Sequence, residues 1–470
     1  MEGQSAATTL GTQGIGRLMV RFAVPSIVAQ VVNSLYNMVD QIFIGQGVGY
    51  LGNAATNVIL PMMVLLIALG QMIGDGCAAW ISLKLGRGEA EDAARGVGSA
   101  ITLTIVVGLV LMVLGVIFLE PLCRLFGATD AVLPYAMGYG RIIAWGYPLS
   151  AICCAFSSIL RADGRPHITM LGLLMGCGTN FVLDPLFIFV FHWGVEGAAW
   201  ATVLGQAINA VYFLLCLPRF RSIVLRRAHL LPRPRIAGRM LLLGMPSFIT
   251  QISAVFVIYV VNNALVSYGA LSKYGPDIPL AALGVTMKVN QLVNSMVLGL
   301  AVGMQPIVGY NYGNGQYPRA KKAFFLALLI STLIMTAAFL LFQFWPEFVV
   351  SLFGEESGLY QEFAVQCLRI YLLLCWSVGV STVIGIFFQS IGKPLQASVL
   401  TLSRQLIFRV PGVILLSRAI GVEGSLWSGP VADGLALILS LVLILLCWRR
   451  LFSPAAERIP SDPAPPPCAE

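Results

Sequence analysis

The chain has 470 residues, of which 58% are hydrophobic and only 11% are charged, and its formal net charge is +8. A soluble domain carries about a quarter charged residues, so this composition excludes an ordinary water-soluble globule and indicates a membrane protein with the lipid bilayer as its surroundings. The Lys and Arg residues gather in alternate loops rather than in one basic patch, which argues against a nucleic-acid partner.

Twelve apolar segments, each long enough to cross the hydrocarbon core of a bilayer, follow one another along the chain. Because unpaired backbone groups cannot face lipid, each segment is predicted to be helical. The predicted spans cover roughly residues 18–45, 53–82, 97–119, 131–158, 166–191, 195–217, 240–267, 280–309, 322–344, 359–389, 394–417 and 424–448. The sequence therefore predicts an all-α, polytopic membrane protein with 12 transmembrane helices.

The basic residues lie mostly in the loops on one side of the predicted membrane. If both termini are cytoplasmic, the cytoplasmic segments hold 21 Lys and Arg, whereas the external loops hold 3, namely Arg124, Lys273 and Arg418. Lys and Arg are enriched in the cytoplasmic loops of membrane proteins. We therefore expect a multi-pass protein of the plasma (inner) membrane with both termini in the cytoplasm.

Five short motifs occur twice along the chain at a nearly constant spacing. They are Val24-Pro25-Ser26 with Met245-Pro246-Ser247, Gly86-Arg87-Gly88 with Gly313-Asn314-Gly315, Leu125-Phe126-Gly127 with Leu352-Phe353-Gly354, Gly164-Arg165-Pro166 with Gly392-Lys393-Pro394, and Gly194-Val195-Glu196-Gly197 with Gly421-Val422-Glu423-Gly424. Each copy contains six predicted spans, an even number, so both copies cross the membrane in the same sense as parallel repeats. This predicts two pseudo-symmetric six-helix lobes (6+6) with a cavity between them that opens to either side by rocking.

The repeat divides the chain into five parts. We expect a cytoplasmic N-terminus at residues 1–16, an N-lobe at 17–218 with six spans, a basic cytoplasmic linker at 219–239, a C-lobe at 240–448 with six spans, and a disordered cytoplasmic tail at 449–470.

Three predicted spans of the N-lobe each carry one stripe of polar residues at helical spacing. Lipid cannot satisfy such groups, so the stripes are expected to face inward. The stripes are Asn33, Asn37 and Asp40 in the first span, Cys177, Asn180 and Asp184 in the fifth, and Thr202, Gln206 and Asn209 in the sixth.

The acids of these stripes, Asp40 and Asp184, are candidates for ion coupling. Two neighbouring buried carboxyl groups can load and release a proton, and carboxylates with Asn and Thr oxygens equally form a site for a hard cation such as Na⁺. The alternative is a polar network that only holds the helices together. Two further acids within spans, Asp75 and Asp433, are predicted to lie close to helix ends, where the structural alternative is favoured.

The C-lobe carries bases within its spans instead of acids. We interpret these bases as structural or gating residues rather than as contacts of a substrate, and polar and Met side chains lie beside the first of them. The bases are Lys288, Arg404 and Arg409, and the neighbours of Lys288 are Met287, Asn290 and Asn294.

Several chemical functions have no motif in this sequence. No GxxxxGK[ST] loop is present, which argues against a P-loop ATP-driven motor. The three histidines, His167, His192 and His229, form no metal-ligand or triad pattern, and the ten cysteines show no zinc-type spacing. We therefore expect a protein that is not an enzyme and has no cofactor.

Together these features resemble the multidrug and toxic compound extrusion (MATE) family. The resemblance extends from about Arg17 to Trp448. It rests on Pro25 and Tyr36-Asn37-Met38-Val39-Asp40, on the loop of Gly86 and Gly88, on Asn180 to Asp184-Pro185, and on the repeated Gly-Val-Glu-Gly. It implies a 6+6 helical exporter that antiports organic cations against H⁺ or Na⁺.

The resemblance also implies which residues bind the coupling ion. In the bacterial branch that the chain resembles most, the ion site maps onto Asp40, Asn180, Asp184 and Thr202, and the same four residues would hold Na⁺ if that is the ion. Another branch adds acids in the seventh and tenth helices, but Ala254–Val266 and Tyr371–Gln389 contain no Asp or Glu.

The expected partners are small organic, cationic and amphipathic molecules. We expect their cavity to be lined by Asn33, Tyr36, Asn37, Gln206, Asn209, Asn290, Asn294 and Met287, and the protein to be a monomer. The alternative function is a flippase for a lipid-linked oligosaccharide or a cell-wall precursor, whose anionic group would suit Lys288, Arg404 and Arg409.

Overall fold

The computed structural model describes residues 9–217, 220, 222–275, 277–351 and 358–451, and over these residues it contains helices but no strands. The elements of the first half are α2 (Ile15–Gly47), α3 (Tyr50–Gly86), α4 (Ala90–Ile117), α5 (Leu119–Leu125), α6 (Leu133–Trp145), α7 (Tyr147–Ala162), α8 (Pro166–Pro185), η1 (Leu186–Val190), α9 (Gly194–Cys216) and η3 (Arg227–Leu230). Those of the second half are α10 (Pro234–Gly269), α11 (Asp277–Gly313), α12 (Tyr317–Phe344), α13 (Pro346–Ser351), α14 (Gly358–Tyr371), α15 (Cys375–Ser390), α16 (Pro394–Leu402), η4 (Ser403–Arg409), α17 (Val410–Ile420) and α18 (Val422–Leu451).

Within the described residues, ten helical segments are long and apolar enough to cross a membrane, and two bent helix pairs bring the number of spans to 12. One pair is α6 with α7, bent by 54°, and the other is α14 with α15, bent by 43°. Each pair is the fourth span of its half, so the bend recurs at the same place in both repeats. The predicted all-α fold with twelve spans is confirmed.

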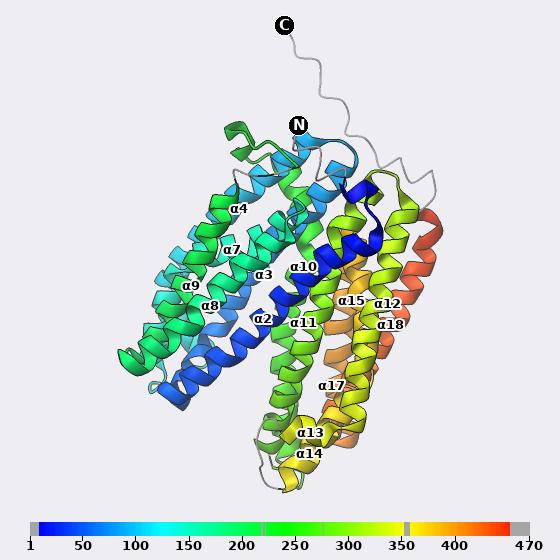
Figure 1. Cartoon of the computed structure of the whole chain (residues 1–470). Helices are drawn as coiled ribbons and strands as arrows, with labels where there is room; N and C mark the ends of the chain where they lie inside the picture. Colours follow the sequence, from blue (N-terminus) through cyan, green and yellow to red (C-terminus); the bar gives the residue numbers. More distant parts are fainter. Residues whose placement is uncertain (1–8, 218–219, 221, 276, 352–357, 452–470) are drawn as a thin grey trace.

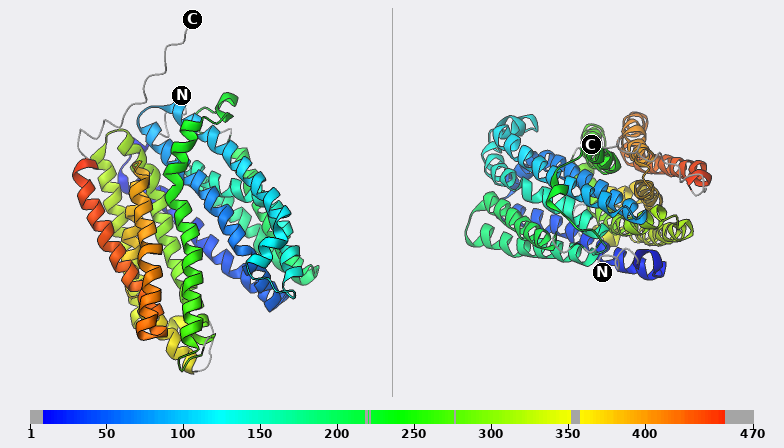
Figure 2. Two further views of the ribbon diagram at one scale, coloured as in Figure 1. Left: turned by 180° about the vertical axis from the view of Figure 1, so that it is seen from behind. Right: turned by 90° about the horizontal axis from the view of Figure 1, so that it is seen from above.

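The spans form two lobes, α2 to α9 and α10 to α18, which occupy separate halves of the molecule (Figures 1 and 2). The lobes meet through two equivalent helix pairs, α3 against α10 and α11 against α2. Because α2 and α3 begin the first repeat and α10 and α11 begin the second, exchanging the repeats maps one pair onto the other. The pseudo-symmetry expected from the paired motifs is therefore present in the packing of the helices.

Glycines allow the backbones of the two lobes to touch. A Cβ atom on Gly76 would lie 2.1 Å from the carbonyl oxygen of Met240, and one on Gly303 would lie 2.7 Å from Cα of Ala23. Both glycines lie in the halves of α3 and α11 that lead toward the face where α2 begins and α18 ends, which we call the terminal face. The ribbons converge toward this face and diverge toward the opposite face (Figure 1).

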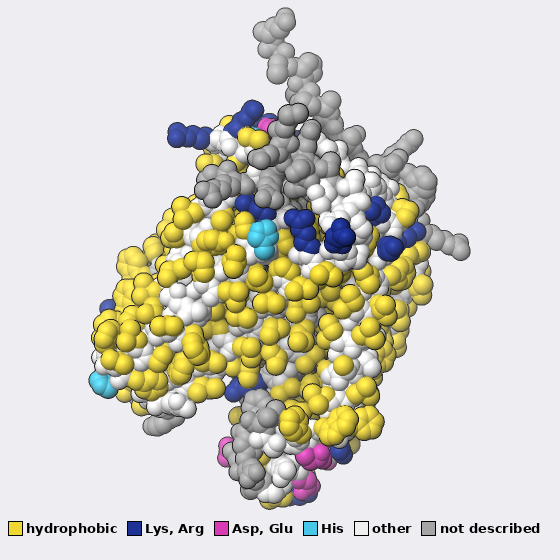
Figure 3. Space-filling model, viewed as in Figure 1, with side chains coloured by type: hydrophobic (Ala, Val, Ile, Leu, Met, Phe, Trp, Pro, Cys, Tyr) yellow, Lys and Arg dark blue, Asp and Glu magenta, His cyan; other side chains and the backbone are white. Residues whose placement is uncertain are grey.

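The surface has the pattern of a membrane protein. A broad belt of apolar side chains covers the visible face of both lobes, Lys and Arg gather near the terminal face, and the surface is hollowed between the lobes at the opposite end (Figure 3). Large apolar side chains such as Leu329, Leu333 and Leu445 are exposed, as is typical of helices that face lipid. In water these exposed apolar residues would be costly, whereas in lipid they are not.

Part of the segment predicted as the linker between the lobes is helical. Helix α10 begins at Pro234, so the last part of the predicted linker 219–239 is helical. The short element η3 packs on α4, where Thr102 Oγ1 donates to the carbonyl oxygen of Leu230 at 2.6 Å and His229 Nε2 lies 3.0 Å from Glu91 Oε1. The hydrogen bond with His229 lowers the pKa of the Glu91 carboxyl group.

The N-terminal segment packs on the C-lobe, and the last helix extends into the predicted tail. Near the N-terminus, Arg319 Nη2 donates to the carbonyl oxygen of Leu10 at 3.2 Å, which ties this segment to the C-lobe. At the other end, α18 continues to Leu451, past the predicted start of the tail at residue 449. The rest of the predicted disordered tail lies outside the described residues.

Candidate ion and substrate site

Two carboxyl groups face each other inside the N-lobe. Asp40 lies on α2 and is 9% exposed, and Asp184 lies on α8 and is 1% exposed. Their side chains are near enough to interact electrostatically with each other. Among the described residues neither acid forms an ion pair, and Oδ1 of each has no hydrogen-bond donor.

Polar side chains from α2, α8 and α9 surround the carboxyl pair. In the orientation of the Asn180 amide that satisfies both its ends, its nitrogen donates to Asp184 Oδ2 at 2.6 Å and its oxygen accepts from Thr202 Oγ1 at 3.2 Å and from the Thr202 backbone nitrogen at 3.1 Å. The Tyr36 hydroxyl lies 3.5 Å from Thr202 Oγ1. The structure thus brings together the four residues predicted to bind the coupling ion, and adds Tyr36 as their neighbour.

Local sequence explains how α8 and α9 come so close. Asn180 and Asp184 are one helical turn apart, so they share one face of α8. On that face a Cβ at Gly205 of α9 would lie only 2.6 Å from the carbonyl oxygen of Gly176. The two glycines let the backbones touch and place Thr202 beside Asn180. After Pro185, which removes a backbone donor, the span continues as the π-helix η1, a feature often found next to functional sites.

A cavity of about 490 Å³ lies between the lobes and next to this pair. Of the residues expected to line a substrate cavity, five do so: Asn33, Tyr36, Asn37, Gln206 and Asn209. Asn180 and Thr202 are also part of the cavity wall, whereas Asp40 and Asp184 are not. Asn180 therefore contacts both Asp184 and the cavity, and Tyr36 and Thr202 stand beside it in the cavity wall.

Three residues expected in the cavity do not line it. Asn290, Asn294 and Met287 lie on the part of α11 nearer the opposite face, where the lobes diverge, and they are absent from the wall. Asn294 Nδ2 instead donates to Asn290 Oδ1 at 2.8 Å, and the Met287 sulfur accepts a hydrogen bond from Tyr371 at 3.3 Å. Their helix face was predicted from periodicity alone, which does not tell where along a helix two lobes separate.

Comparison with known proteins places the chain in a family. The sequence profile of the family described as MatE matches residues 25–186 and 246–415, which are one segment of each lobe. The chain belongs to the MATE family. The resemblance noted in the sequence is thus confirmed, and members of this family are transporters.

Known MATE proteins match along almost the whole chain. A protein named multidrug export protein MepA from Staphylococcus aureus (strain MRSA252) is 23% identical over 447 residues, covering 94% of this chain and 96% of that protein. Its namesake from Staphylococcus haemolyticus (strain JCSC1435) is 23% identical over 442 residues, covering 93% and 95%.

Solved transporter structures share the fold. A structure of the outward-facing conformation of a multidrug resistance MATE family transporter has a TM-score of 0.88 at 23% identity, with 95% of this chain and 98% of that chain covered. A second structure, of a transporter from Pyrococcus furiosus described as having a binding pocket of reverse polarity, has a TM-score of 0.87 at 22% identity, with 95% and 98% covered.

The bases predicted in the C-lobe of this MATE protein lie in three different settings. Arg404 lines the cavity, and its Nε donates to Asp433 Oδ1 of α18 at 3.0 Å. Arg409 is 7% exposed, and its guanidinium lies 4.9 Å from the ring centroid of Tyr371. Lys288 is exposed and is not part of the cavity wall. Among the described residues, Arg404 and Arg409 form their ion-pair and ring contacts within the C-lobe.

Sequence reasoning misjudged two acids and overlooked one base. Asp75 and Asp433 do not lie close to helix ends, because α3 continues to Gly86 and α18 begins at Val422. Arg161 lines the cavity, although the predicted fourth span ended at residue 158 and left this residue in a loop. The missed signal is that Gly164-Arg165-Pro166, and not Arg161, marks the end of the helix.

Proposed function

We propose that this MATE-family protein is a secondary active exporter of organic cations and drugs that exchanges them for H⁺ or Na⁺ by alternating access. The names of the MepA proteins, which are multidrug export proteins, support the cargo class. The observation that carries the proposal is the Asp40–Asp184 pair, which lies without an ion-pair partner behind the wall of the cavity between the lobes.

The carboxyl pair has the properties of an ion-coupling site. Ionisable groups inside a membrane are costly, and those without a basic partner mark ion paths by default. If H⁺ is the coupling ion, a proton shared by the two carboxyl groups would be the bound form. Na⁺ would bind through the same acceptors, since Oδ1 of both acids lacks a donor and Asn180, Thr202 and Tyr36 supply further oxygens. H⁺ and Na⁺ are thus alternatives at one site.

The wall between pair and cavity supplies a route for exchange. Asn180 and Thr202 hydrogen-bond each other and line the cavity, and Asn180 also donates to Asp184. A cargo molecule that displaces or reorients these side chains changes the acceptors available to the ion. Ligands alter each other's affinity by such shared contacts, and the effect is reciprocal.

The charges of the cavity favour cationic over anionic cargo. The bases in its wall, Arg161 and Arg404, each have a carboxylate nearby: Arg161 Nη2 lies 4.0 Å from Asp75 and Arg404 pairs with Asp433. The acids Asp40 and Asp184 have no such compensation. A flippase for an anionic lipid precursor would need uncompensated bases, and among the described cavity residues none is present.

The direction of export follows from the proposed orientation. Lys and Arg gather at the terminal face (Figure 3), which supports a cytoplasmic location for that face in the plasma membrane. The lobes touch on this side through Gly76 and Gly303 and diverge on the other side. The described arrangement is then an outward-open state, from which cargo leaves and to which the coupling ion binds.

The test uses liposomes that contain the purified protein and enclose DNA, which makes imported ethidium fluoresce. Ethidium is added outside, and an outward H⁺ gradient or an outward Na⁺ gradient is imposed separately. We expect uptake with one of the two gradients, lost in Asp40→Asn and kept in the matched control Asp130→Asn, whose side chain is 95% exposed. Uptake with neither gradient would contradict the proposal and make the flippase the next candidate.

A further inference from the structure

Asp75, unlike Asp40 and Asp184, lies on the wall of the cavity, and the proposed ion exchange at the carboxyl pair does not use it. Asp75 is the cavity-lining residue of α3 nearest the terminal face, and its side chain is 19% exposed. Its Oδ1 accepts a hydrogen bond from Ser158 of α7 at 2.6 Å, and its Oδ2 accepts one from Ser247 of α10 at 2.7 Å. Ser158 belongs to the same lobe as Asp75, whereas Ser247 belongs to the other lobe.

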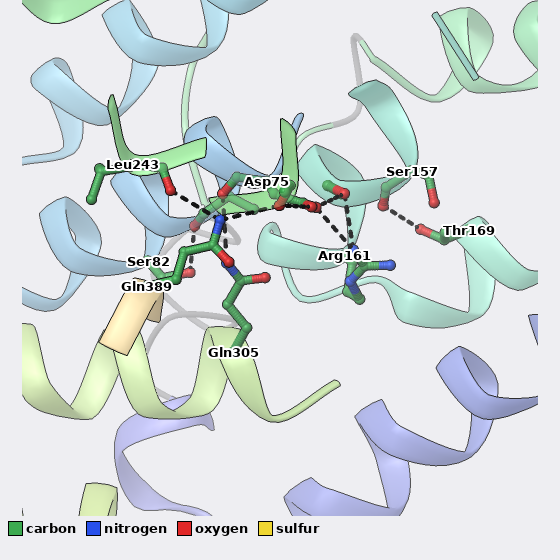
Figure 4. A network of polar contacts seen from close by, with 11 residues as sticks. Asp75, Ser82, Ser157, Arg161, Thr169, Leu243, Gln305 and Gln389 are labelled. Carbon is green, nitrogen blue, oxygen red and sulfur yellow. Dashed lines mark hydrogen bonds and ion pairs between the residues drawn. The ribbon is translucent and has the colours of Figure 1, made fainter. Parts of the chain in front are cut away.

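The surrounding network also joins the lobes. Figure 4 shows Asp75 between Arg161 on one side and the glutamines of the C-lobe on the other. Gln389 Nε2 donates to the carbonyl oxygen of Leu243 at 2.9 Å and lies 3.4 Å from Ser247 Oγ. Gln305 Nε2 lies 3.5 Å from the backbone oxygen of Asp75. The C-lobe therefore reaches Asp75 through α10 and α11, and Gln389 of α15 contacts Ser247, the residue of α10 that caps Asp75.

Each carboxylate oxygen depends on a different lobe. Arg161 Nη2 donates to Ser158 Oγ at 3.0 Å and lies 4.0 Å from Asp75 Oδ1, so all of these contacts stay within the N-lobe. Among the described residues, the donor to Oδ2 is Ser247 alone. If the lobes separate at the terminal face, Oδ1 of Asp75 keeps its hydrogen bond from Ser158, whereas Oδ2 loses its hydrogen bond from Ser247.

The internal repeat shows that closing the lobes does not require an acid here. The spacing that relates Gly86 to Gly313 relates Asp75 to Val302, and the spacing that relates Pro25 to Pro246 relates Ser26 to Ser247. At that equivalent contact between α2 and α11 there is a valine, and Ser26 donates to its own helix at the Phe22 carbonyl oxygen. Both Ser26 and Val302 line the same cavity. The lobes thus pack against each other at the equivalent contact without a carboxylate. This points to a role for the charge of Asp75 other than packing.

We propose that Asp75 is a cargo-binding residue that receives the cationic group of the substrate from the cytoplasm and loses it when the lobes close on the cytoplasmic side. This inference rests on the proposed function. An exporter needs high affinity for its cargo in the cytoplasm-open state and low affinity in the outward-open state, and a ligand shifts such an equilibrium only through its different affinity for the two states. Asp75 supplies that difference, because Ser247 replaces the cargo cation at Oδ2 as the lobes close.

The test measures ethidium uptake into inside-out membrane vesicles, in which the cytoplasmic side faces the added dye. Asp75→Asn keeps the size of the side chain and removes its charge, Asp75→Glu keeps the charge, and Ser247→Ala keeps the carboxylate and removes its cap. We expect Asp75→Asn to raise the KM for ethidium about tenfold with a Vmax within about twofold of the wild type, on the scale of one lost charge contact. Asp75→Glu should stay within about threefold in KM.

Ser247→Ala separates cargo binding from a purely structural latch. With the cap removed, the carboxylate is free in both states, so the KM should not rise while the Vmax falls, because release of the dye is slowed. An unchanged KM in Asp75→Asn, or a KM raised equally in Asp75→Asn and Ser247→Ala, would overturn the inference while wild-type uptake still upholds the proposed function. If the wild type takes up no ethidium under either ion gradient, both this inference and the proposed function are contradicted. If Asp75→Asn does not fold, a raised KM in Ser247→Ala alone contradicts the inference.

Discussion

Gly76 of α3 and Gly244 of α10 touch across the boundary between the two lobes: a Cβ on Gly76 would lie 2.1 Å from the Met240 carbonyl oxygen and 2.9 Å from the Gly244 backbone nitrogen. The same relationship recurs, through the internal repeat, between Gly303 of α11 and Ala23 of α2. Contact of backbone with backbone leaves no side chain that could move aside. These two places therefore define how closely the lobes approach on the terminal face.

The first prediction concerns this contact. Gly76→Ala should block closure of the lobes on the terminal face, because even a methyl group overlaps the backbone of α10. We expect ethidium transport to fall at least about tenfold, although Ala is the better helix former by about 1 kcal/mol. The matched control is Gly238→Ala on α10, where an added Cβ meets nothing within 4 Å. Normal transport by Gly76→Ala would show that this contact does not form during the cycle.

The second prediction concerns the wall between the cavity and the carboxyl pair. Thr202→Val keeps the shape of the side chain and removes the hydroxyl that lies within 3.2 Å of the Asn180 amide. A buried polar group left without its partner costs about 1–3 kcal/mol, so we expect the transport rate to fall about tenfold. Thr202→Ser, which keeps the hydroxyl, should retain most of the rate. A larger loss in Thr202→Ser than in Thr202→Val would mean that the methyl group of Thr202 matters and its hydroxyl does not.

The third prediction concerns the ion pair inside the C-lobe. Arg404→Gln leaves Asp433, which is 6% exposed, without its basic partner. Removing one member of a buried pair lowers the free energy of unfolding by about 3 kcal/mol or more. Because Arg404 is partly exposed, we expect a decrease near the lower end of this range. The melting temperature of the purified protein should fall accordingly. The double variant Arg404→Gln/Asp433→Asn should be more stable than Arg404→Gln alone. If the double variant is the less stable of the two, the pair is not what stabilises these helices.

The fourth prediction concerns Lys288. Its side chain is exposed, and it is not part of the cavity wall. Lys288→Ala should therefore change the rate of ethidium transport by less than about twofold, the size of effect usual for exposed positions. Measured initial rates in the same liposomes test this, with Asp40→Asn as the inactive reference. A complete loss of transport would show that the C-lobe takes a direct part in moving the cargo.

Periodicity in the sequence is enough to predict the elements of the carboxyl site but not their surroundings. Asn180 and Asp184 are four residues apart and must share a face of one helix, and lipid excludes that face from the outside. That Thr202 lies beside Asn180 depends on the contact of Gly176 with Gly205, which no helical period encodes. The repeat likewise predicts two lobes, whereas the depth at which they touch depends on backbone contacts such as that of Gly76.

The sequence misplaces residues for two different reasons. Asn290 and Asn294 have the spacing of a cavity-facing stripe, but they lie where α11 moves away from the N-lobe. Arg161 is predicted to lie in a loop because the apolar run stops before it, although the helix continues to Ala162, and Asp75 is predicted near a helix end although α3 continues to Gly86. Charged residues inside long transporter helices shorten the predicted span, and these are the residues that line the cavity here.

The most direct test of the central claim, ion exchange through the Asp40–Asp184 pair, runs the antiporter in reverse. Liposomes with equal pH and equal Na⁺ on both sides, and with a lumenal indicator for each ion, receive ethidium on the outside only. The account predicts that ethidium entry makes the lumen alkaline, if H⁺ is exchanged, or lowers its Na⁺, if Na⁺ is exchanged, and that Asp40→Asn shows neither change. Ethidium entry with no movement of either ion would contradict it.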